Sequence, residues 1–175
     1  TFDGWYTEKA FRNKVTFPYE VTKAQTLYAK WTRNEAESPV FTVDGNGVLT
    51  GVSGLTESDM RVEIPEQVNG VTVKEIGQKL FKDNQNIGSL IIPDSVRYLG
   101  YAMCSGCTNL KKVHLPAGLT VIPDNAFENC SSLTAINFPD TLVQNRPDAF
   151  GGTSLTEFPA PASLECMWHY PFQYC

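Results

Sequence analysis

The amino-acid sequence predicts a mainly β solenoid preceded by a small β module. Three observations predict it: a proline that recurs about every 23 residues, apolar residues at fixed offsets from it, and an L-x-x-V-x-L spacing ahead of it. One such coil cannot bury its apolar side alone, whereas stacked coils bury a continuous column. We therefore expect parallel strands along one face of the stack, with short helical or 3₁₀ turns on the opposite side.

The repeat is clearest from residue 90 onwards. Pro93, Pro116 and Pro139 are equally spaced in the sequence, and Pro161 follows after an interval that is one position shorter. Counting from each proline, aliphatic residues recur at +3 and usually at +6, Phe at +11, Cys at +14 and Leu at +17. The side chains that we expect in the core share these offsets or their equivalents: Phe81, Leu110, Cys107, Phe127, Cys130, Leu133 and Phe150.

The repeats define the domain organisation. A looser copy with a five-residue insertion precedes Pro93, so four coils run from about residue 62, and a truncated fifth occupies 162–175. The segment 41–52 alternates apolar residues around Asn46-Gly47, which predicts a hairpin that opens the repeat domain, 41–175. Polar residues 33–40 predict a linker. Residues 1–32 hold two β-rich runs and predict a separate module, with Trp5 and Tyr6 among its core candidates.

Composition excludes several classes of partner. The net charge of −5 over 175 residues offers no basic footprint for nucleic acid, and no run of eighteen apolar residues predicts a membrane span in this segment. The chain opens without Met and stops inside a coil, so we interpret it as a segment of a longer protein. An uncapped coil exposes its apolar side, so we expect Trp168, Tyr170 and Phe172 either to fold back over the open end or to mediate self-association with another chain.

Cys104-x-x-Cys107 is the motif that most resembles a chemical site. A metal site needs about four ligands, and neither a second C-x-x-C nor a suitably spaced His accompanies this pair. Because Cys107 shares its offset with Cys130, we interpret the cysteines as small core residues. We expect free buried thiols, with a Cys107–Cys130 disulfide as the alternative. The sequence predicts no catalytic residue, no metal and no cofactor, and an enzymatic interpretation would depend on the two cysteines alone.

The strand predicted before each proline places alternate residues outside the core. One outward row holds Ile91, His114, Asn137 and Pro159, and the neighbouring row holds Ser89, Lys112, Ala135 and Glu157. If the protein binds a ligand, we expect it on this strand face. The candidate binding residues are Ser89, Ile91, Lys112, His114, Ala135, Asn137 and Glu157.

The pattern P-x-x-V-x-x-I-x-x-x-A-F-x-x-C-x-x-L resembles the leucine-rich repeat of BspA-like bacterial surface proteins over roughly residues 41–175. Two departures stand out, since Cys104 occupies a Phe position and "FGGTSL" lacks the Cys. The resemblance implies a secreted or cell-surface protein that adheres to a protein or glycan of a host or neighbouring cell. The alternative function is a structural spacer within a long surface protein.

The segment 1–32 carries a second resemblance. Its F-x-G-W-Y and L-Y-A-K-W-T ends are similar to the second half of a Listeria–Bacteroides (internalin B-type) repeat, a β-grasp-like module. Such modules occur in the same class of long, multi-domain surface proteins, so both resemblances imply the same setting.

Overall fold

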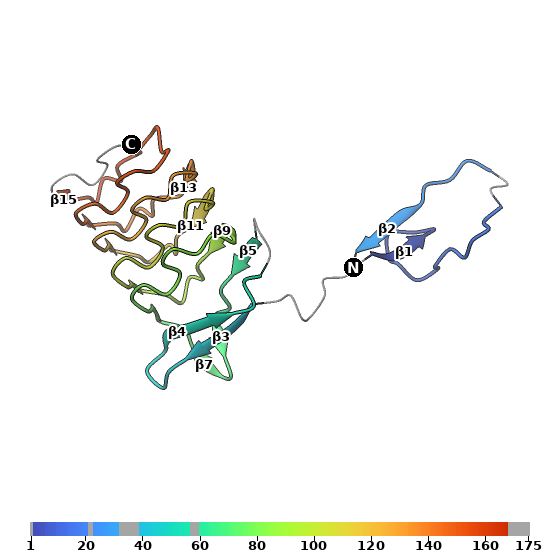
Figure 1. Cartoon of the computed structure of the whole chain (residues 1–175), viewed down its shortest axis with the longest axis horizontal. Coiled ribbons are helices and arrows are strands. Elements are labelled where there is room, and N and C mark those ends of the chain that lie inside the picture. Colours follow the sequence, from blue (N-terminus) through green and yellow to red (C-terminus); the bar gives the residue numbers. More distant parts are fainter. Residues whose placement is uncertain (1, 21–22, 32–38, 57–59, 168–175) are drawn as a thin grey trace. The chain divides into compact units, whose positions relative to one another are not determined.

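The computed structural model describes residues 2–20, 23–31, 39–56 and 60–167. The chain divides into two compact units, Thr1–Ser38 and Pro39–Cys175. Regular structure in the described ranges consists of strands alone. The second unit is a β solenoid whose coils stack in sequence order (Figure 1).

The first unit is a two-stranded antiparallel sheet. β1 (Phe2–Tyr6) pairs with β2 (Tyr28–Trp31), and Lys14 and Lys30 place their ammonium groups 3.1 and 3.2 Å from the Asp3 carboxylate. The pKa of Asp3 lies well below its ordinary value because the Tyr6 hydroxyl and both lysines donate to the carboxylate. Tyr6 is buried, but the expectation of a core Trp5 was wrong, since successive strand residues point to opposite sides and Trp5 is 39% exposed.

A hairpin opens the solenoid unit. It joins β3 (Val40–Val43) to β4 (Val48–Ser53) through a turn in which Asp44 Oδ1 accepts the N–H groups of Asn46 and Val48, each at 2.9 Å. The strand β4 has a second role, because its other edge pairs in parallel with β8 (Glu75–Ile76). The hairpin is therefore continuous with the coils, as the first rung of one of their ladders.

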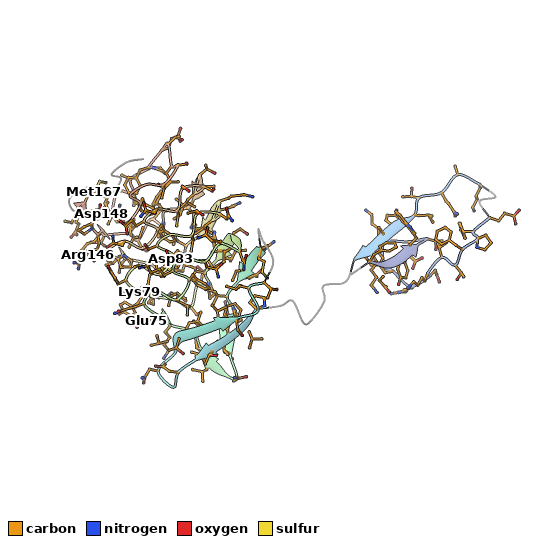
Figure 2. All side chains as sticks on the ribbon, in the orientation of Figure 1. Glu75, Lys79, Asp83, Arg146, Asp148 and Met167 are labelled. Atoms are coloured by element: carbon orange, nitrogen blue, oxygen red, sulfur yellow. The ribbon has the colours of Figure 1, made fainter. Side chains whose placement is uncertain are left out.

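Two parallel ladders run along the stack. The first consists of β5 (Met60–Glu63), β9 (Ile87–Ile91), β11 (Lys112–His114) and β13 (Ala135–Ile136), which lie side by side in Figure 1. The second ladder is made of two sheets: β10 (Tyr98–Leu99) pairs with β8 in the sheet of β4, and β12 (Val121–Ile122), β14 (Gln144–Asn145) and β15 (Cys166–Met167) form a separate three-stranded sheet in the following coils. Figure 2 shows Glu75 and Met167, which belong to this ladder, on the side of the stack away from β9 and β11.

The insertion in the early coil forms a hairpin of its own. Its strands are β6 (Gln67–Val68) and β7 (Val71–Thr72), joined by Asn69 and Gly70, both of which have positive φ. Two central residues with positive φ match the twist of a tight two-residue hairpin, which explains how the insertion leaves the coil register intact.

The expectation of helical or 3₁₀ turns was wrong for the described residues. The segment of each coil that lies between its second-ladder strand and its next first-ladder strand consists of turns and contains no helix. Residues at +9 and +13 adopt positive φ, as at Asn125 (56°) and Asn129 (58°), and this interrupts any right-handed helix. Alternate N–H groups instead bond to the next coil. Cys104 donates to the Ala126 carbonyl at 2.9 Å, and Phe127 donates to the Ala149 carbonyl at 2.8 Å.

The core is a column between the two ladders and the turns. Its aromatic members share one position per coil, and the rings of Phe127 and Phe150 stack with centroids 5.5 Å apart and planes 9° from parallel. Residues of the first ladder that face inward, including Val62, Leu90 and Val113, lie in register on neighbouring strands. The side chains that the offsets from the recurring prolines placed in the core are all buried: Phe81, Leu110, Cys107, Phe127, Cys130, Leu133 and Phe150.

Candidate ligand-binding face

The outward residues of the first ladder form two rows across neighbouring strands. In one row, Ser89 on β9 lies opposite Arg61 on β5 and Lys112 on β11, and Lys112 lies opposite Ala135 on β13. The side chains between these positions face the core and are buried. Because of this alternation, one face of the ladder packs against the core and the other face is open to solvent.

The second row lies two residues further along the strands. In this row, Ile91 lies opposite Glu63 on one side and His114 on the other. Arg61 and Glu63 also form an exposed ion pair, with 3.2 Å between Arg61 Nη2 and Glu63 Oε2. We call the two rows together the strand face, from Arg61 and Glu63 on β5 to Ala135 on β13.

Three open hollows lie on the strand face, and His114 lines each of them. The first, which we call the basic hollow, has a volume of about 290 Å³ and lies over β5, β9 and β11. The side chains at its wall are Arg61, Ser89, Ile91, Lys112 and His114. Three of these five can donate hydrogen bonds from a basic group, and none of the described residues at this wall carries a carboxylate.

The second hollow lies on the proline side of the basic hollow and is acidic. It is lined by Glu63, Glu66 and Asp94 together with Ile91 and His114. Asp94 is already engaged in the fold, because its Oδ1 accepts the backbone N–H of Ala117 at 2.8 Å.

The third hollow, of about 490 Å³, opens beyond β13. Its far wall includes Glu157 and Pro159, two residues that the repeat frame places in the outward rows. The segment that carries them is not a strand, and β13 is the last strand of the ladder. The rows of outward residues thus continue into this coil without continuing the sheet.

Asn137 shows how the ladder changes at this point. Its Oδ1 accepts the Leu115 N–H at 2.7 Å, and its Nδ2 donates to the Leu115 carbonyl at 2.9 Å. In the preceding coil the equivalent N–H, that of Ile92, bonds to a backbone carbonyl, that of His114. The side-chain amide therefore replaces a strand contact, and Asn137, a candidate for ligand binding, is used to hold the neighbouring coil.

The cysteines that suggested a chemical site have structural hydrogen bonds. The thiol of Cys107 donates to the Phe81 carbonyl at 2.9 Å, and that of Cys130 donates to the Cys104 carbonyl at 3.1 Å. Each bond thus runs from a +14 side chain to the equivalent carbonyl of the preceding coil. Burial raises the pKa of Cys104 and of Cys130, so both thiols are held in the protonated form. Cys107 and Cys130 therefore mark a packing position that prefers a small hydrogen-bond donor.

The repeat that unites these features matches a known family. The family model described as the BspA type leucine rich repeat region matches residues 61–175, with six copies. The chain belongs to this family. The assignment confirms the resemblance seen in the repeat frame, and the strand ladders confirm the solenoid that the BspA-type repeat predicts. A comparison with curated proteins finds no match to this chain.

Solved structures of bacterial leucine-rich repeat proteins are similar to this chain. A leucine-rich repeat protein of T. pallidum is 26% identical over 82% of this chain and 68% of its own, with a TM-score of 0.67. One from Bacteroides capillosus is 26% identical over 79% and 88% of the two chains, with a TM-score of 0.53. One from Bacteroides ovatus has a TM-score of 0.67 at 22% identity, and 77% of this chain spans 37% of that protein.

The repeat frame did not identify Arg61 and Glu63 as members of the strand face. The signal was present in "MRVEIP", where apolar residues alternate with charged ones immediately before Pro65. Among the described residues, no group of three or more His, Cys, Asp or Glu side chains is placed to hold a metal ion. The described residues also contain no helix that is long and apolar enough to cross a membrane.

The opposite side of the BspA-type stack carries exposed aromatic residues. Tyr98 and Tyr101 are 66% and 44% exposed, and the Lys79 ammonium lies 5.6 Å from the centre of the Tyr101 ring. The predicted aromatic contacts at residues 168–175 lie outside the described residues. Cys166, in contrast with the other described cysteines, is only partly buried.

Proposed function

We propose that this BspA-type repeat unit is a non-enzymatic binding module of a bacterial cell-surface protein. Its ligand is a protein or glycan on a host or neighbouring cell, and it binds through the strand face. The observation that carries the proposal is the register of the first ladder, which aligns the exposed residues of four strands into one surface with three open hollows. A solenoid suits this use because stacked coils extend a surface without a deep cavity.

The use of the cysteines supports a role without catalysis. Cys107 and Cys130 donate to carbonyls of the preceding coil, and burial keeps Cys104 and Cys130 protonated. A catalytic or metal-binding cysteine acts as an accessible thiolate, whereas Cys104, Cys107 and Cys130 are all buried.

Family membership supports the location at the cell surface. The matched repeat is that of BspA-type proteins, and the segment 1–32 resembles a module of long surface proteins.

A binding experiment with the whole chain tests the proposal. The chain is applied to arrays of host glycoproteins and glycans beside a strand-face variant, Lys112→Glu/His114→Glu, and a control variant on the opposite side, Tyr98→Ser. We expect the wild type and the control to bind the same ligands and the strand-face variant to lose them. Equal binding by all three chains would overturn the proposal.

A structural spacer is the second candidate function. The observation that favours it is the mixed charge of the strand face, where an acidic hollow adjoins a basic one. Mixed charges are typical of a solvated surface as well as of a binding site. The spacer becomes the better description if the wild-type chain binds nothing on the arrays.

A further inference from the structure

We infer that the basic hollow holds the anionic group of an acidic sugar, a carboxylate or a sulfate. The inference rests on the proposed function and names the chemistry of the ligand. Its starting point is the clustering of cationic side chains in a chain region that is otherwise acidic. Residues 39–175 contain eight Lys or Arg against fourteen Asp or Glu, yet Arg61 and Lys112 line one small hollow together with His114.

Strand register brings these groups together. Arg61 and Lys112 lie on β5 and β11, on either side of Ser89 on β9, so their backbones are about 10 Å apart at the usual strand spacing. His114 is two residues beyond Lys112 on the same side of β11. An anion between the flexible side chains of Arg61 and Lys112 would accept charge-assisted hydrogen bonds from both, with the Ser89 hydroxyl beneath it.

The Arg61–Glu63 ion pair does not oppose this arrangement. Both side chains are 66% exposed, so a ligand anion can compete for the guanidinium at little cost. Glu63 lines the neighbouring hollow, and Ile91 and His114 line both. The carboxylates therefore bound the basic hollow on its proline side and exclude an anion from that direction.

A sugar fits the remaining wall of the hollow better than a peptide does. The backbone groups of β9 are paired with strands on both sides, so an extended peptide cannot add to the sheet there. Recognition must come from side chains, which here are the half-buried aliphatic surface of Ile91, one hydroxyl and basic donors. An acidic sugar matches them with an apolar ring face, hydroxyl groups and one anion, and a volume of about 290 Å³ suits one such residue.

Titration of the whole chain with defined probes tests the inference. The probes are sialyllactose, a sulfated disaccharide, neutral lactose and a glutamate-rich peptide, and the readout is the change in amide ¹H–¹⁵N chemical shifts. We expect sialyllactose or the sulfated disaccharide to shift the signals of β5, β9 and β11 and lactose to shift none. Lys112→Gln and Arg61→Gln should each weaken this binding at least tenfold, while Lys82→Gln, an exposed lysine on the turn side, should change it less than twofold.

The other outcomes overturn the inference without deciding the proposed function. Equal binding of lactose and sialyllactose would show that the anion is not recognised, and binding of the acidic peptide alone would exclude a sugar. If no probe binds, the basic hollow is not an anion site. The array experiment then still decides whether the strand face binds another ligand, so the two failures are distinguishable. Unchanged far-ultraviolet circular dichroism of each variant confirms that the fold is intact.

Discussion

The side-chain amide of Asn137 holds both backbone polar groups of Leu115, accepting the N–H at 2.7 Å and donating to the carbonyl at 2.9 Å. Leu115 is buried, so neither group has ready access to replacement water. The pair joins two coils at the point where the regular ladder stops.

Asn137→Ala should therefore lower the free energy of unfolding by about 1–3 kcal/mol, the cost of leaving buried backbone groups without partners. Urea denaturation measures the effect. Thr156→Ala, at an exposed position on the adjoining coil, is the control and should change the free energy by less than about 0.5 kcal/mol. Equal midpoints for the two variants would show that the amide does not support the strand.

Asn145 gives a prediction of opposite sign. It is fully buried in the second ladder, level with Ile122 and Met167, and its side-chain Oδ1 and Nδ2 have no hydrogen-bond partner. Asn145→Leu, which restores the aliphatic residue of the other coils, should raise the free energy of unfolding by about 1–3 kcal/mol. Gln144→Leu, at the adjacent and more exposed position, should not do so. A lower melting temperature for Asn145→Leu would mean that the amide is satisfied.

The stacked aromatic rings of the core predict a large loss of stability when one of them is removed. Phe127 is fully buried and stacks on Phe150, so Phe127→Ala should lower the free energy of unfolding by about 3–5 kcal/mol through lost burial and the cavity that remains. Tyr98→Ala removes an aromatic ring that is 66% exposed and should cost much less. Similar denaturation midpoints for the two variants would contradict the coil register.

The proline-based frame predicted the solenoid, its strand positions and its core offsets because burial repeats with the coil. It missed the basic hollow because the outward rows were not extended to the strand before Pro65, although Arg61 stands four residues before that proline, as Lys112 does before Pro116. The strand register places Arg61 opposite Ser89, in agreement with this spacing. The turn conformation was missed for another reason. The +13 position holds Asp, Gly or Asn in each complete coil, and +9 holds Asn125 and Asp148 in two of these coils, which signals positive φ rather than a helix.

The apparent loss of the Cys in "FGGTSL" also has a physical explanation. Thr153 stands at +14 in that coil and is buried like Cys107 and Cys130. Both residue types are small and carry a donor, so the position selects size and hydrogen bonding rather than sulfur chemistry. Sequence letters alone made this substitution look like a departure from the repeat.

Close contact between coils predicts a glycine requirement. A Cβ atom at Gly100 would lie 2.5 Å from the backbone nitrogen of Gln78 and from the carbonyl carbon of Gly77, in the preceding coil. Gly100→Ala should therefore destabilise the solenoid by about 1–3 kcal/mol, because backbone must move to make room. The matched control is Gly45→Ala, where a Cβ meets no atom within 4 Å and stability should be unchanged or slightly higher. Thermal unfolding of both variants gives the comparison, and equal melting temperatures would be the contrary result.

The buried thiols predict a dependence of stability on alkaline pH. Burial raises the folded-state pKa of Cys104 and Cys130 above the ordinary value of 9.0, so above that pH the unfolded chain releases protons that the folded chain retains. The contribution of Cys130 to the free energy of unfolding should therefore be constant below about pH 8 and should be lost progressively above pH 9, by up to about 1.4 kcal/mol per pH unit. Urea midpoints of the wild type and of Cys130→Ala between pH 7 and 10.5 measure this, and parallel curves would show that Cys130 does not contribute.

The turn-side hydrogen bonds have a mechanical consequence. Each runs from one coil to the next in the same sense, as from Phe81 to Met103, from Cys104 to Ala126 and from Phe127 to Ala149. A tensile load along the stacking direction pulls along these bonds, and the weakest junction between two coils opens first. Coils should then detach singly, and each would release about 75 Å of contour length at the reach of an extended chain. Under a pulling force such a stack would lengthen in small steps and dissipate mechanical energy at each step.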